Sequence, residues 1–311
     1  MTRLNQDWWE QDFHLHTTYS DGSLRPMELL ESLVGLGVRH VAITDHESVR
    51  AYRELDVHRI PTGLELHPGI ELDCQWQDFE VHLLGLDFRP DHPDLEAYLD
   101  HIHRVRRVQY LRLMEAINRE LREEFLTPET VFPPETDTWM KPHIFQRLGQ
   151  HPRFQHLDPE DRYRFFKEWL ADRGLRVEIP RPTLAEGIDL IHRAGGYAVL
   201  AHPGYYWKHG MAFPESLRVM KEMGLDGLEV FYPYYQPNAP EFPTETAAIE
   251  TVLTLYQWGQ EFRLLMTRGS DIHRPEHRTE RYRHLHRVRQ AVAALSDPGP
   301  LDARGPAGEA G

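Results

Sequence analysis

Residues 12–21 read Asp-Phe-His-Leu-His-Thr-Thr-Tyr-Ser-Asp, an alternation of apolar and imidazole side chains that runs into a turn sequence. Successive side chains of a β-strand point to opposite faces of the sheet, so we expect His14 and His16 to share one face. Asp21 follows within a turn, because the run Ser20-Asp21-Gly22 has turn-forming composition. Two imidazoles with a carboxylate nearby are metal ligands, so this stretch predicts one part of a metal site.

Length and composition indicate a soluble α/β enzyme. The chain has 311 residues, of which 40% are hydrophobic and 27% charged, and α/β barrels of this size commonly form one domain. No apolar run approaches the roughly 20 residues that span a bilayer. Residues 1–10 lack the apolar core of a secretory signal, so we expect a cytoplasmic location and no membrane partner. Cys74 is the only cysteine, which excludes an internal disulfide and a thiolate-rich metal site.

The charge balance argues against duplex DNA as a partner. The sequence has 49 acidic and 35 basic residues, with a formal charge of −14, and such a surface repels a phosphate backbone. It also has 20 histidines, which is more than packing requires. Bound cations would supply the local positive charge that a phosphorylated substrate needs.

A βαβ unit is predicted next. Pro26 suits the first turn of a helix, and apolar residues recur at helical spacing until Gly35. The apolar run of residues 40–46 then forms a strand with Asp45 and His46 at its carboxyl end. In α/β barrels the chemistry lies at the carboxyl ends of parallel strands, so both side chains are expected at the site.

Two further strands and a helical insertion follow. Residues 66–74 and 80–88 have the pattern of strands and contribute Glu71 and His82. The amphipathic spacing of the next residues predicts a long helix, and helical patterns resume after an irregular, proline-containing part. We therefore expect residues 95–182 to form a mostly helical insertion.

Strands and helices alternate again after the insertion. The strand of residues 197–201 ends at His202, and another strand is expected at residues 227–231. A last strand leads into Asp271 and His273. The expected organisation is a discontinuous barrel of residues 1–94 and 183–295, the insertion between its two parts, and a disordered tail at 296–311.

Nine residues near the predicted strand ends are candidate metal ligands. One first-row ion takes four to six ligands including water, so nine ligands fit two or three ions better. Imidazole mixed with carboxylate suits manganese, zinc or iron, and such a cluster would be positive enough to attract phosphate. The nine are His14, His16, Asp21, His46, Glu71, His82, His202, Asp271 and His273.

Each of these residues taken alone has a simpler explanation, such as an exposed strand, a packed histidine or a capping pair at a turn. Their ordered conjunction favours a metal site. The remaining histidines, including His67 and His101, lie outside the pattern and are expected to have no ligand role.

Seven short motifs carry the nine residues, in the order Asp12-Phe-His-Leu-His16, Ser20-Asp21-Gly22, Thr44-Asp45-His46, Pro68-Gly69-Ile70-Glu71, His82-Leu-Leu-Gly85, Ala201-His202-Pro203 and Gly269-Ser-Asp-Ile-His273. From about residue 12 to 275 the chain thereby resembles the PHP (polymerase and histidinol phosphatase) family. The resemblance implies a distorted (β/α)7 TIM-like barrel with a trinuclear metal site. The helical insertion is similar to that of the branch containing nucleoside 3′,5′-bisphosphate phosphatases and 5′-to-3′ exonucleases.

The resemblance also implies how the ligands are shared. Glu71 would bridge two ions, and Asp12 and Asp45 would orient imidazoles through their other ring nitrogen. The implied groups are His14, His16, Glu71 and Asp271 for one ion, Glu71, His82 and His202 for a second, and Asp21, His46 and His273 for a third.

Five residues are candidate substrate contacts, because a basic clamp facing the metals would bind a phosphate or carboxylate. An equally simple explanation for the arginines is a solvated helix face paired with glutamates. Relatives often have an arginine just after Ala-His-Pro-Gly, where this chain has Tyr205 and, three residues on, a lysine. The candidates are Arg104, Arg106, Lys141, His143 and Lys208.

The sequence therefore predicts a metal-dependent phosphoesterase in which a metal-activated water attacks phosphorus and no side chain acts as the nucleophile. Nucleoside 3′,5′-bisphosphates or short oligonucleotides are the expected substrates. Two alternatives stay open. One is a phosphatase of a small phosphomonoester such as histidinol phosphate, and the other is a non-catalytic metal-binding module.

Overall fold

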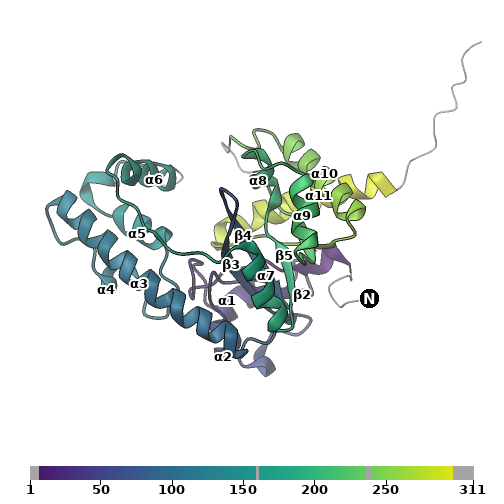
Figure 1. Cartoon of the computed structure of the whole chain (residues 1–311), viewed down its shortest axis with the longest axis horizontal. Helices are drawn as coiled ribbons and strands as arrows, with labels where there is room; N and C mark the ends of the chain where they lie inside the picture. The colour runs from purple at the N-terminus through teal and green to yellow at the C-terminus, as the bar shows by residue number, and fades with distance from the viewer. Residues whose placement is uncertain (1–6, 159–160, 236–239, 297–311) are drawn as a thin grey trace, which may run out of the picture.

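The computed structural model describes residues 7–158, 161–235 and 240–296, and it is built around one sheet of seven strands (Figure 1). The strands lie in chain order from β1 to β7, and each is hydrogen-bonded to the next. Their bounds are Gln11–Asp12 (β1), His40–Ile43 (β2), Glu65–Trp76 (β3), Phe79–Leu86 (β4), Tyr197–Leu200 (β5), Gly227–Phe231 (β6) and Leu265–Arg268 (β7).

The sheet curls into a nearly closed barrel because its two outer strands meet. Phe13 donates its backbone N–H to the carbonyl oxygen of Arg268 at 2.9 Å, and Leu15 forms a parallel bridge with Ile272. Most neighbouring strands are parallel, as the alternation of strands and helices predicts. The seven-stranded α/β barrel expected from the sequence is confirmed.

Strand β4 distorts the barrel, because it runs antiparallel to both β3 and β5. β3 and β4 form a long hairpin in which Asp73 lies opposite His82 and Glu71 lies opposite Leu84. Both candidate ligands therefore lie within strands and not at strand ends, which differs from the expectation. The hairpin extends past the barrel rim, so its middle reaches the level where the parallel strands stop, and Glu71 forms a bridge with His46 there.

Side chains alternate between the barrel interior and the helices outside. On β2, Val41 and Ile43 pack with Leu29, Leu30 and Leu33 of the first helix, which spans Pro26–Leu33 (α1). Ala42, which lies between them on β2, faces the barrel interior. The interior cluster is Phe13, Ala42, Leu84, Leu86, Val199 and Ala201.

Two of the remaining helices around the barrel begin with a threonine whose side chain caps the helix, namely Thr183 and Thr244. Thr183 and Glu186 form a capping box at the helix after the insertion, where each side chain satisfies the other's backbone N–H. The helices are Arg50–Glu54 (α2), Leu184–Arg193 (α7), Pro203–Lys208 (α8), Glu215–Glu222 (α9), Glu245–Glu261 (α10) and Pro275–Ser296 (α11).

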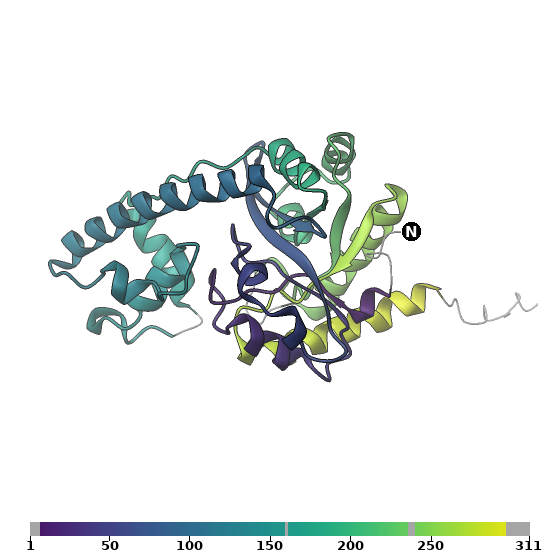
Figure 2. The same ribbon diagram turned by 90° about the horizontal axis from the view of Figure 1, so that it is seen from below.

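A helical lobe projects from one side of the barrel (Figure 2). Its helices are Pro93–Leu121 (α3), Pro128–Val131 (α4), Lys141–Leu148 (α5) and Arg162–Asp172 (α6). Leu95 and Leu99 at the start of α3 belong to the barrel core, whereas Tyr110 and Ile117 further along belong to a separate core shared with α5 and α6. This second core supports the proposal that residues 95–182 are an insertion.

Two expectations remain, namely that the protein has no membrane partner and that residues 296–311 form a tail. Within the part of the chain that the structure describes, no helix combines the length and apolarity needed to cross a bilayer. The tail expected at 296–311 lies outside the described residues, except for Ser296, which is the last residue of α11.

Candidate metal centre

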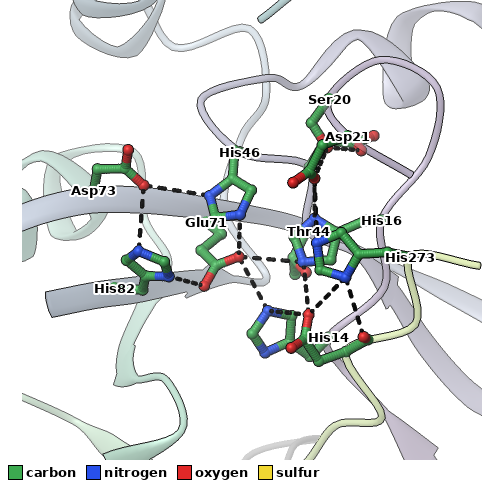
Figure 3. A network of polar contacts seen from close by, with 12 residues as sticks. His14, His16, Ser20, Asp21, Thr44, His46, Glu71, Asp73, His82 and His273 are labelled. Carbon is green, nitrogen blue, oxygen red and sulfur yellow. Dashed lines mark hydrogen bonds and ion pairs between the residues drawn. The ribbon is translucent and has the colours of Figure 1, made fainter. Parts of the chain in front are cut away.

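The nine candidate ligands converge at one end of the barrel, in overlapping groups of donor atoms. Figure 3 shows the part of this cluster around Glu71. His14, His16 and Asp21 follow β1, and the other loop residues follow β2, β5 and β7. β3 and β4 supply one ligand each from the hairpin. Four overlapping groups bring donor atoms within 4.8 Å of one another, namely His16, Asp21, His46 and His273; His14, Glu71 and His202; His14, His16 and Asp271; and His46, Asp73 and His82.

The carboxylate of Glu71 lies between two sets of imidazoles. Its Oε2 atom is 3.0 Å from His14 Nε2 and 3.2 Å from His16 Nε2. Its Oε1 atom is 2.8 Å from His82 Nδ1 and 3.4 Å from His202 Nε2. In this position Glu71 would give one carboxylate oxygen to each of two ions, which is the bridging role that the resemblance implies.

The other carboxylates complete the arrangement. Asp271 Oδ1 lies 3.2 Å from His16 Nε2 and 3.3 Å from His273 Nδ1. Asp21 Oδ1 lies 3.2 Å from His273 Nε2, so the two ring nitrogens of His273 face different carboxylates. His46 Nε2 is 3.3 Å from Glu71 Oε2, which places His46 between the Glu71 and Asp21 groups.

Divalent cations fit this donor set. Nδ1 of His16 and Nδ1 of His202 are buried without a hydrogen-bond partner among the described residues, and a buried polar group left in this way is costly. Six imidazoles and three carboxylates are the nitrogen and oxygen donors that manganese, zinc and iron accept. His202 and Asp271 have φ angles of 32° and 51°, strained values of the kind that cluster at functional sites.

Charge complementarity already holds the cluster together in the protein alone. Burial lowers the pKa of His82, but the carboxylates of Glu71, Asp73 and Glu80 together outweigh burial and raise that pKa to about 9. For Glu71 itself, burial raises the pKa, and the imidazoles of His14, His46 and His82 lower it to well below its ordinary value. The carboxylates are therefore ionised and ready to bind cations.

Two acidic residues outside the motifs support the imidazoles. Glu229 on β6 is fully buried and accepts from His14 Nδ1 at 2.9 Å and from the backbone N–H of His202 at 2.8 Å. Asp73 on β3 lies 3.3 Å from His46 Nδ1. Such carboxylates fix the ring orientation of metal-binding histidines. The only sequence signal for Asp73 is its spacing of two residues from Glu71, which places both on one face of β3. The sequence carries no such signal for Glu229.

Asp12 and Asp45 have other partners than the imidazoles expected for them. Asp12 accepts from the backbone N–H of Ser270 at 2.8 Å, which helps to join the first and last strands. Asp45 accepts from the hydroxyl groups of Thr17 and Ser20, both at 2.6 Å. The chain turns back after His16, and this turn brings the hydroxyl groups of Thr17 and Ser20 to the Asp45 carboxylate. Asp45 therefore holds the loop that carries Asp21.

Two adjoining cavities open over the cluster. The first, of about 320 Å³, is lined by seven of the nine ligands together with Pro142 and Tyr163 of the lobe and with Arg274. The second, of about 180 Å³, is lined by Arg106, Lys141 and Arg181 among others. Arg274 was not among the expected contacts, and its position directly after His273 is the only feature of the sequence that indicates a place at the site.

The five expected substrate contacts lie in different surroundings. Lys141 lines the second cavity, and Arg106 lines it too but pairs with Asp73 at 2.6 Å. His143 is buried and caps the start of α5 by accepting from the Met140 N–H. The described lining of the two cavities does not include Arg104, His143 or Lys208. Lys208 lies over the Trp207 ring, with its Nζ 4.9 Å from the ring centroid.

Comparisons with known proteins agree with this geometry. Residues 12–174, more than half of the chain, match the model of the PHP domain family. The 5′–3′ exoribonuclease Rnm of Escherichia coli is 31% identical over 281 residues, which cover 85% of each chain. A 3′,5′-nucleoside bisphosphate phosphatase of Chromobacterium violaceum is 26% identical over 221 residues, covering 70% of this chain and 75% of the relative.

A solved structure supports the same assignment. A protein described as a metal-dependent phosphoesterase of Bifidobacterium adolescentis superposes with a TM-score of 0.69 and 27% identity, covering 85% of this chain and 87% of that one. The family match spans the β1–β4 ligands, and the structural similarity covers 85% of this chain. The chain therefore belongs to the PHP domain family and is a metal-dependent phosphoesterase, a hydrolase of phosphoester bonds.

Proposed function

We propose that this phosphoesterase acts on nucleoside 3′,5′-bisphosphates or on the ends of short oligonucleotides. The observation that carries the proposal is the cavity of about 320 Å³, in which seven candidate ligands face Tyr163 of the helical lobe. Its volume lies at the low end of the roughly 300–1,000 Å³ of small-molecule sites, which supports a substrate of nucleotide size. The names of the two curated relatives support a nucleotide substrate.

The nine ligands would hold two or three divalent ions of manganese, zinc or iron in the groups that share Glu71. Such ions activate water at neutral pH and stabilise the charge of a transferring phosphoryl group. Glu229 holds the His14 ring through Nδ1, so that Nε2 faces the cluster. Tyr232 donates its hydroxyl to Asp271 Oδ2 at 2.6 Å and leaves Oδ1 directed at the imidazoles.

Lys141 and Arg274 are the proposed phosphate contacts. Both line the cavities, and among the described residues no carboxylate forms an ion pair with either. By contrast, Arg106 and Arg181 are paired with Asp73 and Glu80, each at 2.6 Å. The described lining of the first cavity contains no serine, threonine or cysteine, which supports hydrolysis without a covalent intermediate on one of these residues.

The substrate proposal is tested with a panel of phosphate esters. Metal-stripped protein is reconstituted with Mn²⁺ or Zn²⁺, and hydrolysis of a nucleoside 3′,5′-bisphosphate, a 5′-phosphorylated short RNA and histidinol phosphate is compared. We expect kcat/KM for one of the nucleotides to exceed that for histidinol phosphate by at least about tenfold. A preference for histidinol phosphate would overturn the nucleotide proposal and leave the phosphoesterase assignment intact.

Variants separate substrate contacts from the metal centre. Arg274→Gln and Lys141→Gln should each raise KM for the bisphosphate with bound metal unchanged, because loss of one charged hydrogen bond costs about 1.5–3 kcal/mol, roughly tenfold or more. Arg104→Gln, an exposed arginine outside the cavity lining, is the matched control. Equal KM values in all three variants would exclude Lys141 and Arg274 as phosphate contacts.

A further inference from the structure

A second cluster of histidines lies at the opposite end of the barrel. His40 and Glu65 are the first residues of β2 and β3, and they are register partners in the parallel pair. His67 follows two residues after Glu65 and pairs with Ala42, which faces the barrel interior. Side chains two residues apart on a strand share a face, so all three point to the interior at its amino-terminal end.

One donor atom from each of these residues lies within 4.8 Å of the donor atoms of the other two. His40 Nδ1 lies 3.2 Å from His67 Nε2 and 3.4 Å from Glu65 Oε2, and His67 Nε2 lies 3.9 Å from Glu65 Oε1. Ligands of a tetrahedral zinc ion, at bond lengths of about 2.0–2.2 Å, are about 3.3 Å apart. Two of the three separations therefore already match the edge of a zinc tetrahedron, and a rotation of the Glu65 side chain closes the third.

A carboxylate orients the buried imidazole. His67 Nδ1 lies 2.9 Å from Asp87 Oδ1, and donation of its N–H to Asp87 leaves the Nε2 lone pair directed at His40 and Glu65. The backbone N–H of Asp87 donates to Pro68 at 2.8 Å, which anchors the loop after β4 beside β3. A carboxylate behind a histidine in this way is the usual arrangement around zinc.

We propose that His40, Glu65 and His67 bind a zinc ion that links β2 and β3 at the amino-terminal end of the barrel. The site joins β2, β3 and, through Asp87, the end of β4. Only 3% of the His67 side chain is exposed but 52% of that of Glu65, so an ion enters from solvent and keeps an open fourth position for water. His67 precedes Glu71 by four residues, which is about 13 Å along the strand, so this site is separate from the catalytic cluster.

The rival explanation is a direct hydrogen bond between His40 and His67 with no metal. That bond needs one imidazole to donate and the other to accept, whereas zinc needs both nitrogens unprotonated. The two explanations differ in metal stoichiometry and not in activity.

The test counts zinc in the full-length protein. Metal-stripped protein is saturated with Zn²⁺, passed through gel filtration and analysed by mass spectrometry for zinc per chain, beside the variants His40→Gln, His67→Gln and Glu65→Gln. We expect His67→Gln and His40→Gln to bind one zinc fewer and Glu65→Gln to bind that zinc at least about tenfold more weakly. Phosphatase activity measured with Mn²⁺ should stay within about twofold of the parent in all three.

His101→Gln, an exposed histidine of α3, is the matched control and should retain every zinc. Glu65 is half exposed, so its variant folds even if the His67 variant does not. A crystal of the zinc-loaded protein should show an anomalous peak between His40 and His67. Equal zinc content and affinity in the parent and the three variants would overturn the proposal.

Discussion

Glu71 is the single side chain on which the metal centre is organised. It is 1% exposed, and its two oxygens face different imidazoles, with His14 and His16 near Oε2 and His82 near Oε1. A carboxylate is the only protein side chain that can bridge two cations with two equivalent anionic oxygens. Its position inside β3 gives it the rigidity that a loop residue lacks.

Glu71→Gln should therefore remove activity without unfolding the protein. The amide keeps the size of the carboxylate but loses its charge and one of its two metal-binding oxygens, so we expect at least one metal ion fewer per chain. The loss in kcat should be about 100-fold or more. Metal analysis and hydrolysis of p-nitrophenyl phosphate measure both. Glu115→Gln on the exposed face of α3 is the control, and retention of full activity by Glu71→Gln would contradict the bridging role.

His82 should make the stability of metal-stripped protein depend on pH. Its pKa is about 9 in the folded protein, because Glu71, with smaller contributions from Asp73 and Glu80, outweighs burial, against about 6.5 in an unfolded chain. The raised pKa contributes stability that is fully present below pH 6.5 and is lost as pH rises to about 9. The urea midpoint of the stripped protein should accordingly fall over this range by more than that of His82→Gln.

Bound metal should remove that dependence, since a ligated imidazole is already deprotonated. The Mn²⁺-loaded protein is therefore the internal comparison. A difference between the stripped wild type and His82→Gln that stays constant from pH 6.5 to 9 would rule out the Glu71–His82 ion pair.

At the scale of the elements, the lobe is connected to the metal centre through α3. Arg106 of α3 is buried and donates to Asp73 Oδ2 at 2.6 Å, while Asp73 Oδ1 faces His46. Glu47, also buried, lies 4.0 Å from Arg106 Nη2. Burial and the Asp73 charge raise the pKa of Glu47 to about 7, and Arg106 opposes this rise. One guanidinium thus compensates two buried acids, of which Asp73 orients the His46 imidazole.

Arg106→Gln should consequently destabilise the protein and weaken metal binding together. Removal of one partner from a buried ion pair costs about 3–5 kcal/mol, since the remaining carboxylate is left uncompensated. Urea unfolding measures the loss, and metal titration should show weaker binding at the His46 group. Arg104→Gln, two residues away on the exposed side of α3, should change neither. Equal stability of the two variants would show that the pair has no structural role.

At the scale of the whole molecule, the metal centre joins both ends of the barrel sequence. His14 precedes the first helix and His273 precedes the last, and the backbone of Asp271 donates to His14 at 2.8 Å. An unfolded chain does not bring these donors together. Metal binding therefore stabilises the native fold in proportion to the logarithm of the free metal concentration.

Mn²⁺ at 100 times its dissociation constant should stabilise the fold by about 2.7 kcal/mol per site. For a chain of this size that corresponds to a rise in Tm of several degrees. Differential scanning calorimetry of the stripped and loaded protein measures the shift. His14→Ala/Asp271→Ala should show a smaller one, and an equal shift in this variant would mean that the ion binds elsewhere.

The sequence by itself determined the barrel and the nine candidate ligands. Strand and helix periodicities are local, and most of the ligands follow directly from strand-ending motifs such as residues 12–21 and 269–273. Strand β4 was predicted as a strand, but not as one that runs against its neighbours. Only two residues separate β3 from β4, which is compatible with a hairpin turn. The antiparallel pairing of the two strands then shows that the middle of the hairpin reaches the site.

Only the tertiary structure decided which side chains support the ligands and line the cavities. Glu229 lies 215 residues from His14 in the chain, and neither its strand nor its neighbours carry a motif. The same holds for His40 and His67, whose pairing depends on the register of β2 against β3. A motif records residues that are close in sequence, whereas these contacts exist because the barrel closes and brings distant strands to one side-chain layer.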